Sequence, residues 1–579
     1  MDPILQEQLF RGNPSDEMEV ILKLRSDQIL PKQTRIISRF GEIATCRIPR
    51  TSIHDLWSHP NVEDVQACRH VTLEESNSVP SSARLAGGSS AFASKRKKPF
   101  DFSGKGVVLG IIDKGFDPTH PDFIDPSGSS RFLAMWDQSS TLGNNSYGYG
   151  RMFFQKELNA AIRSRQPFQT LAYHPAWFDP GQMGSHGTHT CGIAAGNGRT
   201  GPMGVAPDVE IVAVNLSLGR TGKQISLGNS VRLLEAIDFI SKVAGNQPLV
   251  ISCSIGLHAG DHKGASLFEQ AIDYWLQERK ARACVMSCGN YFLSNTHQSG
   301  KLRQGEQQRI SWVVRPRDRT PNELELWYSS QDELEIAVCL PNSKQCFRVL
   351  PQTRKTLILH GQKIGSLYHR LDPNTQDNQV VCYLYPHAPA GRWNLQLFAK
   401  DIQQGGYHAY IEKDSPLGND QSFFPQSEAN PLFTTGSICN GFLSIAVGAV
   451  DSHSKGFKLA PFSSAGPTAD FRVKPEICAE GMNVPGPKSA GKGMVRSTGE
   501  HTLKSGTSMA CPHVAGAIAL LFEATPRPLH IQETRELLFS STLKPEIISR
   551  LDRYRYGYGV LDIEKALEQI NTTALSKRQ

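Results

Sequence analysis

The middle of the chain alternates between two hydrophobic patterns: continuous apolar runs, and runs with an apolar residue at every third or fourth position. The first pattern is typical of buried strands and the second of the helices that cover them. Strands are predicted at residues 107–112, 209–215, 249–253 and 283–287, and helices at residues 186–195, 230–243 and 265–277. This alternation predicts an α/β fold, a parallel sheet with helices on both faces.

The alternation of strands and helices stops near residue 294 and resumes near residue 434. The second part contains an apolar run at residues 442–450, a helix after Ser508, and helices near residues 532–539 and 561–570. In between, turn residues separate short alternating runs. These runs are residues 309–314, 323–328, 333–340, 347–350, 356–359, 379–385, 393–398 and 407–412. They predict an all-β unit, a sandwich or a jelly roll, inserted into the α/β domain.

The first 73 residues have a pattern of their own, with alternating runs at residues 19–25, 42–48 and 62–68 and a helical segment at residues 51–58. They predict a small α+β domain with the order strand, short helix, strand, helix, strand. Residues 74–103 are rich in Ser, Ala and Gly and are predicted to be a linker. The predicted units are therefore residues 1–73, the linker 74–103, the α/β domain in two parts (104–293 and 434–579), and the β-insert 294–433. A smaller insertion separates Asp113 from His186.

Ser508 stands just before an apolar helical run, in the segment Lys-Ser-Gly-Thr-Ser-Met-Ala-Cys-Pro-His-Val-Ala-Gly. A serine hydroxyl is a weak nucleophile at neutral pH and needs a neighbouring base, which in turn needs an orienting group. The start of a helix favours an oxyanion, because its N–H groups form the positive end of the helix dipole. The alternative is that Ser508 is a helix cap, a role that Ser505 or Thr507 fills equally well.

Two upstream motifs supply a candidate base and a candidate orienting acid. His186 is the first histidine of Gly-Ser-His-Gly-Thr-His-Thr-Cys-Gly, and His189 is its competitor, for which we expect a structural hydrogen bond. Asp113 ends a buried apolar strand, where an unpaired carboxylate would be costly. Asp117 and Asp122 are its rivals, but they lie in turn sequence, where carboxylates commonly cap the backbone.

Asn290 ends the segment Cys-Val-Met-Ser-Cys-Gly-Asn, directly after a predicted strand. An amide at such a position is able to donate a hydrogen bond to a developing oxyanion, although a loop asparagine is otherwise an ordinary turn residue.

Taken in order, these motifs resemble those of the subtilisin-like serine peptidases (subtilases, peptidase family S8), in which Asp, His and Ser follow one another along the chain. The resemblance implies a catalytic triad of Asp113, His186 and Ser508, with Asn290 in the oxyanion hole. It also implies that Ser254, Ile255 and Gly256 bind the substrate as an added strand. Leu257 stands where a subtilase typically repeats glycine, so the shape of the primary pocket differs.

The same resemblance assigns the N-terminal domain, through the segment 56–65, to the family propeptide. That unit is expected to occupy the cleft before processing somewhere between Leu73 and Phe100. The two insertions resemble a subgroup that includes the clostridial spore-germination peptidases. Some subtilases bind calcium, but the loop at residues 196–204 contains no carboxylate, so no metal is predicted at this family position and no cofactor is implied.

Composition excludes several classes of protein. With 39% hydrophobic and 20% charged residues and a formal net charge of +7 over 579 residues, the chain is neither disordered nor basic enough to suggest nucleic acid as a partner. No apolar run reaches the length of a membrane span, and no signal peptide is visible, so the predicted location is cytoplasmic, with leaderless export left open. The 12 cysteines lack paired spacing, which predicts reduced thiols.

The predicted function is therefore a serine endopeptidase that acts on polypeptide substrates through a Ser508 acyl-enzyme. Two alternatives remain at this point: a peptide ligase or cyclase that uses the same acyl-enzyme, and a non-catalytic subtilase-like protein that acts by binding.

Overall fold

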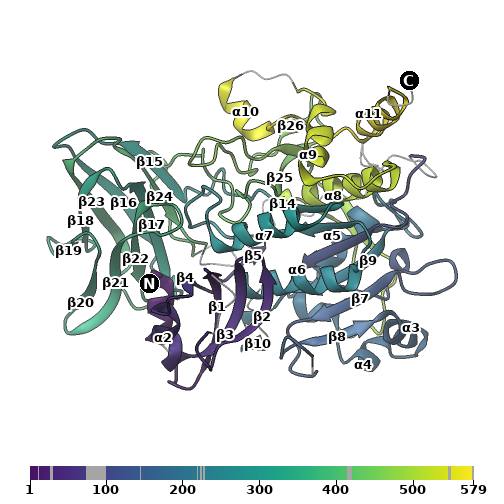
Figure 1. Cartoon of the computed structure of the whole chain (residues 1–579), viewed down its shortest axis with the longest axis horizontal. Coiled ribbons are helices and arrows are strands. Elements are labelled where there is room, and N and C mark those ends of the chain that lie inside the picture. Colours follow the sequence, from purple (N-terminus) through teal and green to yellow (C-terminus); the bar gives the residue numbers. More distant parts are fainter. Residues whose placement is uncertain are drawn as a thin grey trace.

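A nine-stranded sheet forms the centre of the molecule (Figure 1). The computed structural model describes residues 1–10, 12–25, 30–73, 100–143, 145–217, 220–221, 224–225, 228–413, 420–545 and 549–576. The sheet order is β26-β25-β14-β12-β6-β9-β7-β8, with β27 also paired to β25. Its parallel strands are β6 (Val108–Asp113), β7 (Phe132–Asp137), β9 (Glu210–Asn215), β12 (Leu249–Cys253), β14 (Arg282–Ser287), β25 (Ile445–Asp451) and β27 (Ile477–Glu480). β8 (Arg151–Phe154) and β26 (Lys458–Leu459) pair antiparallel at its two ends.

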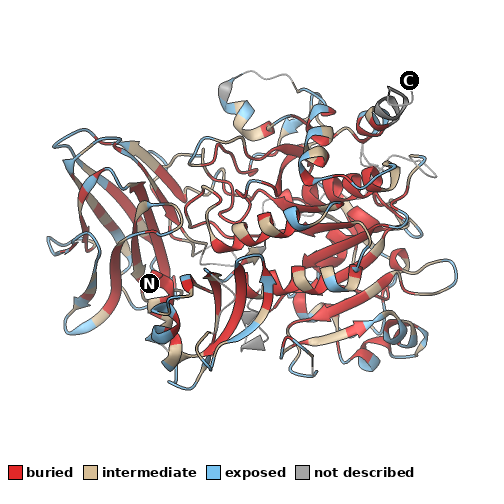
Figure 2. Ribbon diagram, in the orientation of Figure 1, coloured by how far each residue is buried: buried red, intermediate tan, exposed pale blue. Residues whose placement is uncertain are grey.

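Helices cover both faces of this sheet. α5 (His186–Ala195) and α8 (Thr507–Ala524) pack against each other and against the strands on one face. α6 (Ser230–Ala244) and α7 (Leu267–Glu278) cover the other face, where Gly110 lets the Ile240 side chain approach the backbone of β6. The buried residues follow the central strands and α8 (Figure 2). The observed architecture is therefore the α/β fold that the alternating pattern predicts, a mostly parallel sheet with helices on both faces.

The N-terminal unit is a four-stranded antiparallel sheet that lies on α6 and α7 (Figure 1). Its order is β2-β3-β1-β4, with β1 Glu17–Leu24, β2 Arg35–Phe40, β3 Ile43–Pro49 and β4 Val62–Ala67. The helices α1 (Pro3–Leu9) and α2 (Ile53–Trp57) complete the unit. The short helix predicted between the first two strands is wrong: a strand, β2, forms there, because pairing with β3 outweighs its weak local pattern.

The β-insert consists of two antiparallel sheets with a shared core that includes Trp312 and Trp393. One sheet has the order β15-β24-β17-β22-β21-β20 and the other β16-β23-β18-β19. The strands are β15 (His297–Lys301), β16 (Gln307–Val314), β17 (Asn322–Ser329), β18 (Glu333–Cys339), β19 (Cys346–Val349), β20 (Thr353–Leu359), β21 (Gln362–Leu371), β22 (Asp377–Leu384), β23 (Gly391–Asp401) and β24 (Gly406–Ile411).

One expectation about the cysteines is wrong. Cys339 and Cys346 form a disulfide, whereas the other ten cysteines are free. The two lie directly opposite each other on β18 and β19, with Cα atoms 4.0 Å apart. A separation of seven residues in the sequence does not reveal such cross-strand pairing, because it depends on the register of the hairpin.

The remaining elements join or flank the central sheet. Between β6 and α5 lie η2 (Pro121–Phe123), β7, β8, α3 (Gln155–Arg163), α4 (Pro167–Leu171) and η3 (Pro175–Phe178). β28 (Val484–Pro487) and β29 (His501–Lys504) form a hairpin, followed by α8, α9 (Ile531–Ser540), α10 (Arg550–Tyr556) and α11 (Ile563–Ser576). Among the described residues, α8 is the one helix long and apolar enough to cross a membrane, but 89% of that span is buried inside the protein.

Candidate active site

Asp113 ends β6 as a fully buried carboxylate with three hydrogen-bond donors around it. Its Oδ1 accepts from Nδ1 of His186 at 2.6 Å and from the backbone N–H of Lys114 at 2.6 Å. Its Oδ2 accepts from the hydroxyl of Thr190 at 2.8 Å. These bonds compensate the burial of the charge and hold the imidazole in one orientation.

His186 is the first residue of α5 and is 3% exposed. Because Asp113 binds Nδ1, the opposite ring nitrogen, Nε2, is the atom that remains to exchange a proton. Nε2 is buried and makes no hydrogen bond within the described part of the chain. A buried imidazole nitrogen without a partner is costly in a merely structural role and is the expected state of a general base.

Ser508 is the second residue of α8, so its N–H lies at the positive end of that helix. Its hydroxyl donates to the backbone oxygen of Ser254 at 3.4 Å, and the hydroxyl of Ser254 donates to the backbone oxygen of Ser508 at 3.1 Å. We expected one hydrogen bond from His186 to the acid and one to the serine; the structure has the first and lacks the second. Such contacts are often long before substrate binds and shorten in the enzyme–substrate complex.

The amide of Asn290 is held in place by the start of α8. Its Oδ1 accepts from both the backbone N–H and the hydroxyl of Thr507, each at 3.1 Å. Since the oxygen is fixed on Thr507, the orientation of the NH₂ end is fixed as well. Asn290 thus lies beside Thr507, the residue that precedes Ser508 at the start of α8.

The segment that contains Ser254 ends in the short strand β13 (Ile255–Gly256). β13 pairs antiparallel with β5 (Thr72–Leu73), with Leu73 opposite Ile255 and Thr72 opposite Gly256. The hydroxyl of Thr72 also donates to the backbone oxygen of Gly256 at 3.2 Å. An extended segment that follows the N-terminal sheet is therefore paired as an added strand along β13, which begins one residue after Ser254.

The competing residues are engaged elsewhere. His189 bonds the backbone oxygen of Thr502 through Nε2 at 3.2 Å, and burial holds its pKa well below the usual value. Asp117 accepts from Thr119 and from the backbone N–H of Ala490. The sequence analysis did not identify Thr190, whose hydroxyl bonds Asp113. Its position four residues after His186, on the same face of α5, is the feature that could have indicated it.

One group among the described residues has the spacing of a metal site: His120, Asp122 and His501, with ligand atoms within 4.8 Å of one another. Hydrogen bonds already engage the group, since Nε2 of His501 bonds Oδ2 of Asp122 at 3.0 Å and Nε2 of His120 bonds the backbone oxygen of Glu500 at 3.1 Å. Asp122 is the single carboxylate of this group, and its Oδ1 accepts from Thr200. This donor set does not fit calcium, which requires six or more oxygen ligands.

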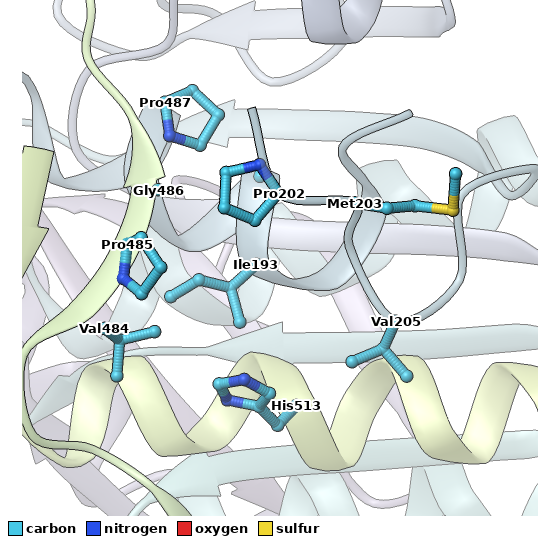
Figure 3. A pocket seen from close by; sticks show the side chains of 10 residues that line it. Ile193, Pro202, Met203, Val205, Val484, Pro485, Gly486, Pro487 and His513 are labelled. Carbon is cyan, nitrogen blue, oxygen red and sulfur yellow. The ribbon is translucent and has the colours of Figure 1, made fainter. Parts of the chain in front are cut away.

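The cysteines near the motifs are structural. Cys191, Cys253, Cys288 and Cys511 are all buried, and burial raises the pKa of the Cys511 thiol to about 12. Such a thiol is protonated at neutral pH and is a poor nucleophile. A pocket of about 10 Å³ between α5, α8 and β28 is lined mostly by apolar side chains, with His513 at one end, and has room for no more than one water (Figure 3).

The central sheet with its two helical layers, and the Asp–His pair at the start of α5, define a subtilisin-like protein. The sequence profile of the subtilase family matches residues 104–309 and 417–559, more than half of the chain, and the chain belongs to that family. The unmatched residues between these two segments fall within the β-insert.

Individual relatives match more weakly. The chain is 32% identical to bacillopeptidase F of Bacillus subtilis (strain 168) over 195 residues, 33% of this chain and 12% of that protein. It is 23% identical to the PII-type proteinase of Lacticaseibacillus paracasei over 466 residues, 73% of this chain and 23% of that protein. The chain thus spans less than a quarter of the length of either relative. Its fold is similar to that of the Clostridium perfringens CspB protease, with a TM-score of 0.69, 22% identity, and coverage of 82% of this chain and 96% of that chain.

Proposed function

We propose that this chain is a serine endopeptidase that hydrolyses polypeptides through an acyl-enzyme on Ser508. The observation that carries the proposal is the Asp113–His186 hydrogen bond, which leaves Nε2 as the basic nitrogen on a helix packed against the helix of Ser508. Membership of the subtilase family supports the same reading.

Each residue has a defined part in the proposed reaction. Nε2 of His186 removes the proton from the Ser508 hydroxyl as its oxygen attacks the peptide carbonyl, and Asp113 stabilises the imidazolium that forms. The N–H of Ser508 and the amide of Asn290 stabilise the negative charge on the carbonyl oxygen. His186 then gives the proton to the leaving amine, and water releases the acid product by the reverse steps.

Products of a defined peptide test this proposal. The full chain is incubated with the peptide, and the products are read by mass spectrometry. We expect two fragments whose masses sum to that of the peptide plus one water, and no reaction with Ser508→Ala. Joined or cyclised products without added water would show that an amine intercepts the acyl-enzyme, as in a ligase. Cleavage by Ser508→Ala at the wild-type rate would refute the role of Ser508.

We further propose that the N-terminal domain occupies the cleft before processing. The pairing of β5 with β13 supports this, because Thr72 and Leu73 lie in the strand position that a substrate would occupy. We expect the wild-type chain to be cleaved between Leu73 and Phe100, within a segment that is largely outside the described residues, and Ser508→Ala to remain full-length. N-terminal sequencing of both proteins is the test, and active full-length wild type would make this unit a permanent domain.

A further inference from the structure

The β-insert contains a cavity of about 190 Å³ where β16 and β22 end and β17 and β23 begin. Two loops that cross between the two sheets form its walls: residues 315–321, between β16 and β17, and residues 385–390, between β22 and β23. None of the residues that line it belongs to the candidate active site. A volume of this size accommodates one ring or one amino-acid residue, since a cavity of about 150 Å³ binds benzene. The cavity therefore fits a small ligand or the end of a chain.

Both loops are held in one conformation by the sandwich. In the first loop the N–H of Asp318 donates to the backbone oxygen of Arg315 at 3.2 Å. In the second, the backbone oxygen of Pro389 accepts from the indole N–H of Trp393, a buried core residue, at 2.8 Å. Each loop also contains two prolines, which restrict the backbone. A cavity with walls fixed in this way loses little conformational entropy when a ligand binds.

Two arginines, Arg315 and Arg319, line the cavity. Arg315 is held in place, because its Nε donates to the backbone oxygen of Gln421 at 3.1 Å and its guanidinium lies 4.6 Å from the centre of the Phe423 ring. Arg319 is exposed, and among the described residues it has no hydrogen-bond or ion-pair partner. Its donors are therefore free to bind an anion, and a guanidinium matches a carboxylate through two parallel hydrogen bonds.

A buried amide supplies the second recognition group. Asn322 also lines the cavity and is 2% exposed. Its Nδ2 donates to Oδ2 of Asp318 at 2.6 Å and to the backbone oxygen of Thr320 at 3.3 Å, whereas its Oδ1 is buried and has no hydrogen-bond partner in the described part of the chain. Oδ1 of Asp318 accepts from the N–H of Thr320 at 2.8 Å, so both oxygens of this carboxylate are engaged. An unpaired buried acceptor is destabilising, and a ligand N–H that bonds Oδ1 of Asn322 removes that cost.

We propose that this cavity binds a carboxylate with an adjacent hydrogen-bond donor, the chemistry of an N-acylated amino acid. Arg319 pairs with the carboxylate, and Oδ1 of Asn322 accepts from the neighbouring N–H. The rest of the ligand contacts the apolar part of the lining, which includes Val314, Leu384 and Pro386. Two sources offer this chemistry, the C-terminal residue of a polypeptide and a free acylated amino acid. The inference concerns a second site and does not depend on the proposed peptidase function.

Binding of three small probes to the full wild-type chain tests the proposal, measured by saturation-transfer NMR titration. The probes are N-acetyl-leucine, N-acetyl-leucinamide, which lacks the charge, and 4-methylpentanoate, which lacks the amide N–H. For a ligand of this size we expect a Kd on the order of 1 mM for N-acetyl-leucine. Each of the other two probes should bind about 10-fold more weakly, because each leaves one recognition group without its partner.

Variants locate the site. Arg319→Ala should weaken the binding of N-acetyl-leucine about 10-fold and leave that of N-acetyl-leucinamide unchanged, and Arg319→Lys should retain part of the affinity. Because Arg319 is exposed, these changes leave the core of the insert intact. Arg309→Ala, which changes an exposed arginine on β16 that does not line the cavity, is the matched control and keeps the wild-type affinity.

Equal binding of N-acetyl-leucine and N-acetyl-leucinamide would overturn the inference, as would wild-type affinity in Arg319→Ala. So would the absence of saturable binding at about 10 mM N-acetyl-leucine, ten times the expected Kd. The two sources are separated on the Ser508→Ala chain, which should leave peptides intact, with a short peptide that ends in Ala-Ala-Leu and a free carboxylate. Tighter binding of this peptide than of N-acetyl-leucine assigns the cavity to polypeptide C-termini, and equal or weaker binding assigns it to the free acylated amino acid.

Discussion

At the scale of single residues, the site is organised around the carboxylate of Asp113. Three donors from two segments converge on it: the imidazole of His186 and the hydroxyl of Thr190, both on α5, and the N–H of Lys114. A buried carboxylate with this many partners is fixed in position and stays available to stabilise an imidazolium. Thr190 is fully buried and its hydroxyl bonds Asp113, so it is a positioning residue.

Thr190→Val tests that role. Loss of a hydrogen bond to a charged group costs about 1.5–3 kcal/mol, and we expect kcat to fall about 10-fold with little change in KM, because only part of that energy bears on the transition state. Thr190→Ser retains the hydroxyl and should restore most of the rate. Steady-state kinetics on one peptide measures both variants. Equal kcat values for the valine and serine variants would show that the hydroxyl has no part in positioning Asp113.

The sequence predicted Asp113 and His186 because each stands in a motif whose local pattern is unusual for its element. The hydrogen bond between them depends on the packing of α5 against β6, which no local pattern specifies. Thr190 could have been found from its spacing to His186. The hydrogen bond from the backbone N–H of His258 to Glu412, which follows β24, could not have been predicted, because 154 residues separate the two.

At the scale of elements, the β28–β29 hairpin is attached to the turn after β6 by the Asp122–His501 contact. Burial alone would raise the pKa of Asp122. The hydrogen bond from His501, together with that from the backbone of Thr200, outweighs burial, and the net pKa lies below the usual value. A carboxylate whose pKa is lower in the folded state stabilises the protein above its unfolded-state pKa and loses that contribution as the pH falls.

Asp122→Asn should therefore lower the Tm at pH 7, and the difference from the wild type should narrow as the pH falls from about 5 toward the lowered pKa. Thermal unfolding followed over this pH range is the measurement. Asp101→Asn, a change to an exposed carboxylate in the segment before β6, is the control. We expect EDTA to leave the Tm of the wild type unchanged, since the hydrogen bonds themselves hold the loop. A Tm that falls in EDTA and recovers with a divalent cation would contradict this account.

Elements with strong local patterns were predicted within two or three residues, as for α5, α6 and β12. The strands that the sequence did not predict have a common physical cause. β2, β15 and β21 are strands whose residues become extended because a partner strand lies beside them. Such pairing energy is nonlocal, and sequence windows do not contain it.

At the scale of the whole molecule, the N-terminal sheet is held to α6 by a buried ion pair. Arg47 bonds both carboxylate oxygens of Glu235, at 2.9 and 2.8 Å, with side-chain exposures of 4% and 0%. Arg69 at the other end of the unit bonds Glu323 and Glu325 of the β-insert. The N-terminal unit therefore contacts both the α/β domain and the insert, and α6 is covered rather than exposed.

Arg47→Ala leaves Glu235 buried without its cation, which costs about 3–5 kcal/mol for pairs of this kind. After cleavage in the linker, we expect the wild-type N-terminal fragment to co-elute with the remainder of the chain on size-exclusion chromatography and the Arg47→Ala fragment to separate from it. Arg35→Ala removes an exposed pair with Glu17 and should behave as the wild type. Co-elution of both variants would show that the pair does not hold the unit in place.

The position of the β-insert is evident from the sequence because a helical rhythm gives way to strands and later resumes. The contacts of the β-insert with the N-terminal unit are not evident from the sequence. Arg69 and Glu325 form an ion pair, but nothing in the sequence around either residue indicates its partner.

The central claim is that Ser508 is an activated nucleophile with His186 as its base. Intact-protein mass spectrometry after treatment with a fluorophosphonate tests it most directly, with peptide mapping to locate the adduct. We predict one adduct on the wild type, located at Ser508, no adduct on Ser508→Ala, and strongly slowed labelling of His186→Ala. An adduct elsewhere, or equal labelling of the wild type and Ser508→Ala, would contradict the account.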